Sequence, residues 1–463
     1  MKGKIMKDIT NYRDKKVLVL GLAKSGVSAA KLLQKLGALV TVNDAKPFDE
    51  NPDAQELLEN GIKVVTGGHP LTLLDEGFEL IVKNPGIPYT NPIVKGALEK
   101  EIPIISEPEL AYQALSGEMI GITGSNGKTT TTTLIQLMLD KDRQAGHAFL
   151  AGNIGIPATT VVQKLHAEDT MVTELSSFML ASVTALKPHI AVITNIFSNH
   201  LDWHGSRENY VRDKMHITKN QTADDYFVIN WDNPEWQQLS KQTKAQVVPF
   251  SRKDLSEKGA YQRGEFLYFR DEKIMAAEDI KVPGVQNIEN ALAAIAVAKV
   301  SGCSTEAIIE VLKTFSGVKH RVQYVTTFEK RVFYNDSKAT DIEATQVALR
   351  SFKQPIVLIA GGLDRGYTFE KLVPDFKDHV KAIVLIGETA HLLADAAKKA
   401  EVPVIKSANK VADAVPLAYQ LSNPGDIVLL SPANASWDQY KNFEIRGDEF
   451  INAVNKLQNG KKA

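Results

Sequence analysis

The pattern of apolar and polar positions alternates short β-branched runs with longer stretches of helical periodicity. Such alternation is typical of parallel sheets whose strands are joined by crossover helices, so the pattern predicts an α/β protein. In the first part of the chain it predicts a helix that ends near residue 36. It also predicts strands at residues 16–20, 39–43, 63–66, 80–83 and 103–106.

The same alternation continues through the rest of the chain, and no repeat period links its parts, which excludes a solenoid. Further strands are predicted at 119–123, 171–174, 190–194, 226–230, 332–335, 356–360, 382–386 and 426–430. Residues 245–283 differ, because two apolar runs separated by Asp271 and Glu272 indicate a short hairpin within a small β-rich insert. Helices are predicted at 287–300 and 305–314, followed by a linker at 315–318.

These elements divide the chain into three predicted domains, in keeping with its 463 residues at roughly 150 residues per domain. A Rossmann-like domain covers residues 1–114. A central α/β domain with a phosphate-binding loop of the P-loop type and the β-rich insert covers 115–317. A second Rossmann-like domain covers 318–463.

Composition narrows the classes of protein that fit. The formal net charge is -1 and no long run of Lys or Arg occurs, which argues against a nucleic-acid or membrane-surface partner. Cys303 is the only cysteine, so the chain can form no intrachain disulfide and no thiolate metal cluster. Residues 1–13 lack an apolar signal core, and no stretch is apolar enough to span a bilayer. We therefore expect a cytoplasmic protein.

The run from Gly121 to Thr130, GITGSNGKTT, joins a predicted strand to a predicted helix. Small residues let backbone N–H groups converge on phosphate oxygens, while Lys128 would neutralise phosphate charge and the Thr129 hydroxyl would hold Mg²⁺. The strict pattern has a glycine where Ile122 stands, so the loop is a variant. An ordinary glycine-rich turn is the alternative, but the flanking strand and threonine-rich helix favour ATP binding.

A second glycine motif, Gly21-x-Ala23-x-x-Gly26, follows the first predicted strand, and Asp44 ends the next strand. This arrangement resembles the dinucleotide fingerprint, with alanine in place of its middle glycine. A tight structural turn is an equally good interpretation. The motif indicates a nucleotide, which can also be part of a substrate.

Several polar side chains follow strands of the central domain. Glu174 suits a hard cation such as Mg²⁺, although Ser176 or Ser177 also suits the cap of the next helix. The spacing of His200 and His204 is typical of zinc sites, but no glutamate or cysteine assists, which disfavours zinc. Lys214 lies in a helix rich in polar residues, and its sequence context alone predicts a solvated lysine.

Two motifs of the third domain also follow predicted strands. They are Asn335–Asp341, NDSKATD, and Ser431–Ser436, SPANAS. Hydroxyls and amides at the carboxyl ends of strands are where open α/β sheets bind ligands. Helix capping is the alternative role for some of these residues.

Taken together, the motifs resemble those of the Mur ligases of bacterial cell-wall synthesis, over essentially the whole chain. The resemblance rests on GSNGKT (124–129), GNIG (152–155), ELSS (174–177), NHLD (199–202), HR (320–321), DSKAT (336–340) and the segment from SPA (431–433) to NFEIRG (442–447). The last segment resembles the members that add D-glutamate. The resemblance implies a first domain that holds a UDP-sugar substrate, a second that holds ATP, and a third that receives the amino acid.

The implied reaction uses ATP to phosphorylate the L-alanyl carboxylate of UDP-N-acetylmuramoyl-L-alanine, after which the amine of D-glutamate attacks the acyl phosphate. It implies two Mg²⁺ ions, a carbamylated Lys214 and a protein expected to be monomeric. The family resemblance assigns catalytic roles to Lys128, Glu174, His200, Lys214 and Lys338, and metal binding to Thr129, Glu174, His200 and Lys214.

The implied binding residues fall into three groups. The ATP group is Gly124, Ser125, Asn126, Gly127, Lys128, Thr129, Thr130, Asn287, Asn290, Arg321 and Asp336. The UDP-substrate group is Gly21, Ala23, Ser25, Gly26, Asp44, Asn84, Gly86 and Asn153. The D-glutamate group is Thr340, Arg365, Ser436 and Phe443. Because Lys128 and Arg321 lie in different predicted domains, ATP binding would require closure about a hinge near Gly317.

The sequence departs from the family pattern at two places. Arg365 stands where some members carry a lysine, and an arginine can hold a carboxylate bidentately. The run Asp44-Ala45-Lys46 differs from the usual Asp-Thr-Arg. Three alternatives stay open: a Mur-type or folylpolyglutamate synthase-like ligase for another amino acid, a nucleotide-binding oxidoreductase, and a non-catalytic nucleotide switch.

Overall fold

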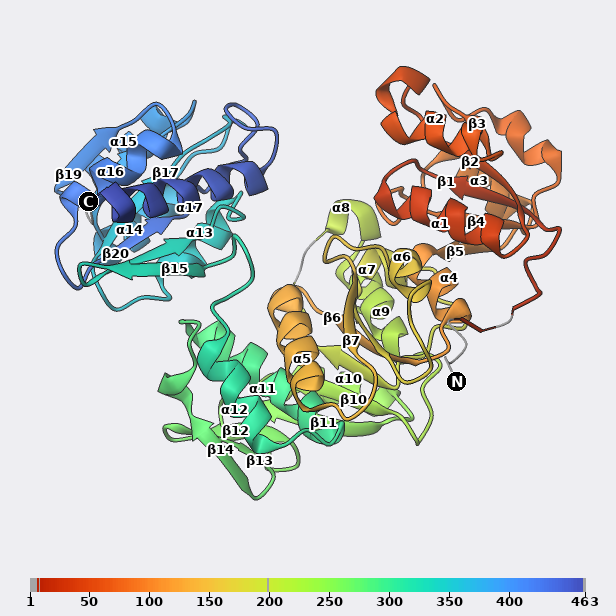
Figure 1. The fold of residues 1–463 in the computed structure, drawn as a ribbon, viewed down its shortest axis with the longest axis horizontal. Coiled ribbons are helices and arrows are strands. Elements are labelled where there is room, and N and C mark those ends of the chain that lie inside the picture. Colours follow the sequence, from red (N-terminus) through yellow and green to blue (C-terminus); the bar gives the residue numbers. More distant parts are fainter. Residues whose placement is uncertain (1–5, 8, 198–199, 461–463) are drawn as a thin grey trace. The chain divides into compact units, whose positions relative to one another are not determined.

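The computed structural model describes residues 6–7, 9–197 and 200–460 and contains three separate β-sheets. By its internal contacts the chain forms two compact units (Figure 1). The first unit comprises Met1–Ala277 and Glu289–Val311, and the second comprises Glu278–Ile288 and Leu312–Ala463. Among the described residues, none of the helices is long and apolar enough to cross a membrane.

The first sheet is fully parallel, with the strand order β3-β2-β1-β4-β5. Its strands are β1 (Lys16–Leu20), β2 (Leu39–Asn43), β3 (Lys63–Val65), β4 (Leu80–Lys83) and β5 (Ile104–Ser106). Its helices are α1 (Lys24–Lys35), α2 (Pro52–Glu59), α3 (Pro92–Glu99) and α4 (Glu107–Ala114). Val17 and Val19 pack in one core with helix α1, whereas Leu18 and Leu20 pack in another with α3. Burial on both faces explains why β1 is an unbroken apolar run.

The central sheet also belongs to the first unit and has the order β14-β13-β12-β11-β10-β9-β6-β8-β7. Its strands are β6 (Glu118–Thr123), β7 (Ala148–Gly152), β8 (Thr170–Glu174), β9 (Ile190–Ile193), β10 (Tyr226–Asn230), β11 (Gln246–Ser251), β12 (Ala260–Arg263), β13 (Phe266–Phe269) and β14 (Glu272–Ala276). Its helices are α5 (Lys128–Asp142), α6 (Ala158–Val162), α7 (Ser177–Leu180), α8 (Leu201–His204), α9 (Arg207–Met215), α10 (Pro234–Leu239), α11 (Val285–Val300) and α12 (Thr305–Thr314).

The hairpin predicted from the apolar runs around Asp271 is present as β13 and β14. It does not form a separate insert, because β12 pairs in parallel with β11 and thereby joins the hairpin to the central sheet.

The third sheet lies in the second unit, with the order β15-β16-β20-β17-β18-β19. Only the β15–β16 pair at one edge is antiparallel. The strands are β15 (Gln323–Phe328), β16 (Arg331–Asn335), β17 (Ile356–Ala360), β18 (Val380–Leu385), β19 (Val404–Ser407) and β20 (Ile427–Leu430). The helices are α13 (Ile342–Leu349), α14 (Val373–His379), α15 (Ala390–Lys399), α16 (Val411–Leu421) and α17 (Phe443–Gly460). The domain boundaries at residues 114 and 317 stay predictions.

Within the first unit, two buried glutamates join helix α4 to segments around the central sheet. Glu107 accepts hydrogen bonds from the backbone N–H and the hydroxyl of Thr159 in α6, at 2.5 and 2.6 Å. Glu109 accepts from the N–H groups of Thr184, Ala185 and Leu186. Burial raises the pKa of Glu107 to about 7. This junction therefore contains a carboxyl group that titrates near neutrality.

Candidate active site

The loop between β6 and α5 has the backbone conformation that a phosphate-binding loop requires. Gly124 and Gly127 adopt φ angles of 146° and 81°. A Cβ at Gly124 would lie 1.9 Å from the Thr194 hydroxyl, and one at Gly127 would lie 2.2 Å from the Asn290 side-chain oxygen. Lys128, Thr129 and Thr130 then form the first turn of α5. The helix thus begins directly at the loop, where its N–H groups favour an anion.

Two residues beyond β9, which the sequence analysis did not select, hold this loop. Asn195 accepts hydrogen bonds from the N–H of Ser125 at 2.9 Å and from the N–H of Asn126 at 2.8 Å. The Thr194 hydroxyl donates to the Asn126 carbonyl at 2.6 Å. In the sequence, these two residues were marked only by their position at the end of the predicted strand 190–194 and directly after it. These bonds fix the loop before any ligand arrives.

Two lysine ammonium groups converge on one carbonyl of the loop. Lys128 donates to the Gly124 carbonyl oxygen at 2.8 Å and to that of Ser125 at 2.9 Å. Lys214, in α9, also donates to the Gly124 oxygen at 2.8 Å. Lys128 thus brings positive charge to the start of α5, where it suits the phosphates of a nucleotide, and Lys214 places a second amine beside it.

The expectation that Lys214 is solvated is wrong. Its side chain is buried, with 2% relative exposure, and its ammonium lies over the ring of Tyr210. Burial and the charge of Lys128 lower its pKa well below the ordinary lysine value. The polar composition of α9 did not reveal this, because the lysine is covered by the loop rather than by an apolar face of its own helix.

Glu174 ends β8 on the same sheet. Its carboxylate is buried, with one oxygen accepting from the Asn153 amide at 3.1 Å and the other without a hydrogen-bond partner among the described residues. A buried carboxylate oxygen without a partner is costly, and an oxygen-seeking cation would satisfy it. Ser176 caps α7 through the N–H of Met179, which confirms the predicted capping role, and the metal-binding role of Glu174 stays a prediction.

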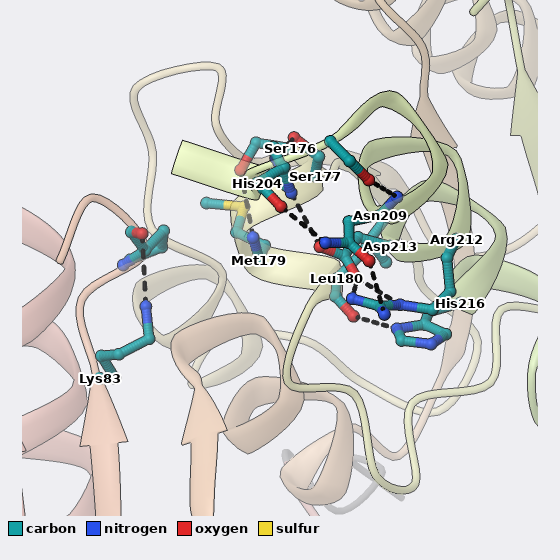
Figure 2. A network of polar contacts seen from close by, with 12 residues as sticks. Lys83, Ser176, Ser177, Met179, Leu180, His204, Asn209, Arg212, Asp213 and His216 are labelled. Atoms are coloured by element: carbon teal, nitrogen blue, oxygen red, sulfur yellow. Dashed lines mark hydrogen bonds and ion pairs between the residues drawn. The ribbon is translucent and has the colours of Figure 1, made fainter. Parts of the chain in front are cut away.

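The two histidines of the NHLD region have different surroundings. His200 is exposed and precedes α8 with a left-handed φ of 53°. His204 is buried, and its ring nitrogens lie 2.8 Å from Asp213 and 2.9 Å from the Ser177 hydroxyl (Figure 2). His204 is therefore committed to a polar network that ties α8 to α7 and α9. Asn199 of the same motif lies outside the described residues.

The predicted UDP-substrate residues of the first sheet lie at the carboxyl ends of β1, β2 and β4. Asp44 accepts from the N–H groups of Leu22 at 2.6 Å and Lys46 at 2.9 Å. A Cβ at Gly26 would lie 1.9 Å from the Gly21 carbonyl, so glycine is needed where α1 meets the loop. Ala23 precedes α1, and Ser25 lies in its first turn.

Asn84 and Gly86 form a turn beside Gly21. The Asn84 side chain accepts from the Gly86 N–H at 3.3 Å, and a Cβ at Gly21 would lie 2.8 Å from the Asn84 Cβ. The structure therefore brings Gly21, Asn84 and Gly86 together at one edge of the first sheet.

The second unit holds Asp336 at the end of β16. Asp336 is buried and accepts from the Ser431 hydroxyl at 2.9 Å and the Val322 N–H at 3.1 Å. Burial raises its pKa to about 7. Arg321 lies beside Val322, and its Nε is buried without a hydrogen-bond partner among the described residues. An unsatisfied guanidinium nitrogen next to a carboxyl group suits a polar ligand such as a ribose or phosphate.

The predicted D-glutamate residues also lie in the second unit. The Lys338 ammonium lies 5.4 Å from the centre of the Phe443 ring, and the Arg365 guanidinium lies 5.0 Å from that of the Trp437 ring. Ser436 precedes Trp437, and its hydroxyl is buried without a partner among the described residues. Thr340 follows Lys338 and donates its N–H to the Lys338 carbonyl.

Arg446, in α17, fastens the loops that carry these residues, although the sequence analysis gave it no role. It donates to the Ser337 hydroxyl at 3.1 Å, to the Ser337 and Asn434 carbonyls at 2.9 Å, and to the Gly361 carbonyl at 3.5 Å. Its side chain is 1% exposed, and burial lowers its pKa to about 10. The loops after β16, β17 and β20 are thus held by one side chain.

Three family models match the chain in sequence. The N-terminal domain of MurD-like Mur ligases matches residues 15–106, the Mur ligase middle domain matches 122–298, and the glutamate ligase domain of Mur ligases matches 320–434. Each match falls on one of the three sheets.

Curated relatives resemble the chain along nearly its full length. The UDP-N-acetylmuramoylalanine--D-glutamate ligase of Lactiplantibacillus plantarum is 64% identical, over 98% of both chains. The protein of the same name from Pediococcus pentosaceus is 60% identical, over 98% of this chain and 100% of its own.

Solved structures share the fold at low sequence identity. MurC of Thermotoga maritima, a UDP-N-acetylmuramate-alanine ligase, has a TM-score of 0.57 at 18% identity and covers 96% of this chain and 99% of its own. MurF of Thermotoga maritima in complex with ADP has a TM-score of 0.56 at 16% identity, over 98% of both chains.

Proposed function

This chain belongs to the Mur ligase family, and we propose that it is an ATP-dependent ligase that joins D-glutamate to UDP-N-acetylmuramoyl-L-alanine in peptidoglycan synthesis. One observation carries the chemistry: Lys128 and Lys214 converge on the Gly124 carbonyl at the start of α5. A charged loop of this kind can hold the transferring phosphate, and phosphoryl transfer depends mainly on positioning and charge neutralisation.

The proposed reaction has two steps. The L-alanyl carboxylate attacks the γ-phosphorus of ATP, the bond to the β-phosphate oxygen breaks, and ADP leaves. The amine of D-glutamate then attacks the acyl carbon and loses a proton, and inorganic phosphate leaves as the amide forms. Lys128 would stay on the phosphate oxygens through the first step, where negative charge moves toward ADP.

The residues around the loop fit Mg²⁺. The unpartnered oxygen of Glu174 and the hydroxyl of Thr129 are hard oxygen donors, which Mg²⁺ prefers. Bound Mg²⁺ would neutralise phosphate charge. On family resemblance we include His200 as a further Mg²⁺ ligand, and it lies exposed before α8. Carbamylated Lys214 would be a ligand of a second Mg²⁺ ion.

Lys214 supports the proposal of carbamylation. Its lowered pKa favours the neutral amine, the form whose lone pair attacks CO₂. The amine nitrogen would bond to the carbon of CO₂ and release a proton, leaving a carbamate anion beside the Lys128 ammonium. Carbon-13 NMR of protein equilibrated with labelled CO₂ tests this step. We expect a carbamate resonance in the wild type, and its presence in Lys214→Arg would assign the signal elsewhere.

In the second unit, Arg365 would face a carboxylate of D-glutamate, and Ser436 and Phe443 would shape its pocket. Lys338 and Thr340 would face the reacting groups. Asn287, Asn290, Arg321 and Asp336 would contact the nucleotide of ATP. The formal net charge of -1 and the lack of a long run of Lys or Arg support the proposal that the protein has no nucleic-acid partner. We further propose a cytoplasmic monomer.

An amino-acid panel tests the proposed specificity. Phosphate release from ATP, in the presence of UDP-N-acetylmuramoyl-L-alanine, should depend on D-glutamate. Release with L-alanine or a diamino acid but not with D-glutamate would reject the choice of amino acid while keeping a ligase. NADPH binding measured by fluorescence would instead favour an oxidoreductase.

A further inference from the structure

A buried lysine closes the first sheet at a position that none of the roles above uses. Lys83 is the last residue of β4 and directly precedes the Asn84–Gly86 turn. Its side chain is 1% exposed. Burying an ammonium group is costly, and burial lowers the pKa of Lys83 to about 8. A buried ammonium group therefore usually has contacts or a function that offset this free-energy cost.

The ammonium of Lys83 is directed at the backbone of the turn that follows it. It donates to the Ile87 carbonyl at 2.7 Å, to that of Asn84 at 3.3 Å and to that of Pro85 at 3.4 Å. Figure 2 shows Lys83 with one dashed contact from its ammonium group. Among the described residues, these carbonyls are its hydrogen-bond partners. One charged donor thus gathers the acceptors of a whole turn and sets the turn's shape.

Two aromatic rings enclose the same ammonium group. The Tyr89 ring centre lies 5.4 Å from Nζ, and the Trp203 ring centre lies 5.5 Å from it. Tyr89 belongs to the segment after the turn, whereas Trp203 lies in α8 beside the central sheet. The two rings also meet edge to face at 5.8 Å. Lys83 therefore links the turn of the first sheet to a helix of the central domain.

The linked helix is the one that begins after His200. Trp203 packs against Phe178 at 4.8 Å between ring centres, and Phe178 packs against His200 at 5.0 Å. A continuous set of ring contacts therefore runs from the turn beside Gly21 to a proposed metal ligand. Lys83 therefore lies between the proposed substrate contacts and the proposed site of phosphoryl transfer.

We propose that Lys83 is a positioning residue for the UDP-linked substrate. It holds the Asn84–Ile87 turn in the conformation that binds the substrate, and it fixes the position of this turn relative to α8 through Trp203. This inference rests on the proposed function, because it takes Asn84 and Gly86 as substrate contacts. Lys83 acts through the turn and touches no reacting atom.

The test removes the charge of the Lys83 side chain and keeps most of its length. Lys83→Met should raise KM for UDP-N-acetylmuramoyl-L-alanine about tenfold, because charged hydrogen bonds that fix the turn are lost. KM for ATP should stay within about twofold. Lys95→Met, at an exposed lysine of α3 in the same domain, is the matched control and should leave both KM values unchanged. Equal rises in both KM values, or no rise, would overturn the proposal.

Two further variants distinguish a failure of the proposed role of Lys83 from a failure of the proposed substrate site. Asn84→Ala should raise the same KM, and the Lys83→Met/Asn84→Ala double variant should be little worse than the weaker-binding single variant, because both act on one turn. Fully multiplicative effects would show that Lys83 acts elsewhere. An unchanged KM in Asn84→Ala would instead overturn the substrate position itself.

If Lys83→Met does not fold, Trp203→Leu provides the second route. Loss of one ring contact should raise KM for the UDP-linked substrate by about threefold, with KM for ATP unchanged. An unchanged KM for the UDP-linked substrate in Trp203→Leu would overturn the link between the turn and α8.

Discussion

The two ammonium groups that meet at the Gly124 carbonyl have different roles in the proposed chemistry. Lys128 donates to the Gly124 and Ser125 carbonyls of its own loop, which places its ammonium group where a phosphate would bind. Lys214 is deeply buried and poorly placed to remain charged, which suits a residue that reacts with CO₂ and becomes an anion. If the two lysines exchanged surroundings, neither would perform its proposed role.

Lys128→Ala should lower kcat for amide formation by about 10²–10³ or more, because one preorganised charge at the transferring phosphate is lost. The side chain lies at a loop surface rather than in the core, so the thermal unfolding midpoint should change little. Product formation and circular dichroism melting measure the two quantities. Amide formation at the wild-type rate would exclude this mechanism, and Lys24→Ala at an exposed lysine of α1 is the control.

Residue roles were predicted from local patterns and from the family resemblance. The glycine-rich loop indicated Lys128, a strand end indicated Glu174, and the resemblance indicated Asp336, and these roles stay predictions. Lys214 was misjudged by composition, since its burial comes from the loop above α9. The roles of Asn195 and Arg446 depend on contacts between segments distant in sequence, which no local pattern reveals.

At the scale of elements, strands buried on both faces were the most predictable. The bounds of β1, β2, β4, β10 and β17 match those predicted. The pattern missed β7, whose residues Ala148–Gly152 include no β-branched side chain, and the edge strands β15 and β19, which are only half-buried or exposed. Where burial is partial, apolar runs are short and pairing with a neighbour decides the strand.

The junction of α4 with α6 should make stability depend on pH. The pKa of Glu107 rises from 4.5 in the unfolded chain to about 7 in the folded protein, so its protonation favours folding below about pH 4.5. That contribution is lost as pH rises through about 7. Between pH 5 and 8 the urea midpoint of the wild type should fall, and Glu107→Gln, which cannot ionise, should show a flatter dependence. Identical slopes in the two proteins would contradict this assignment.

Removal of the Arg446 clamp should loosen three loops together. Arg446→Met keeps much of the apolar length but leaves the Ser337, Asn434 and Gly361 carbonyls without their donor. We expect a loss of roughly 2–5 kcal/mol in the free energy of unfolding of the second unit. We also expect a raised KM for D-glutamate with little change in KM for UDP-N-acetylmuramoyl-L-alanine. Lys456→Met, at an exposed lysine of the same helix α17, is the control.

At the scale of the whole molecule, the proposed ATP residues are divided between two compact units. Lys128 belongs to the first unit, whereas Arg321 and Asp336 belong to the second. We propose that one ATP molecule contacts both groups, and that its binding moves the two units about a hinge near Gly317. Gly317 has a φ of 100°, which glycine adopts readily and which strains other residues, so this position suits a hinge.

Small-angle scattering tests this closure. Addition of a non-hydrolysable ATP analogue with UDP-N-acetylmuramoyl-L-alanine should reduce the radius of gyration, and Lys128→Ala should respond less. Profiles that are superimposable with and without both ligands would argue against closure, without affecting the assignment of the individual sites.

The most direct test of the central claim is the mass of the product. The protein is incubated with UDP-N-acetylmuramoyl-L-alanine, ATP, Mg²⁺ and D-glutamate, and the products are analysed by mass spectrometry. The account predicts one new compound, the UDP-linked substrate plus D-glutamate less one water, with ADP and phosphate released in equal amounts. ATP hydrolysis without this amide, or an amide formed with another amino acid and not with D-glutamate, would contradict it.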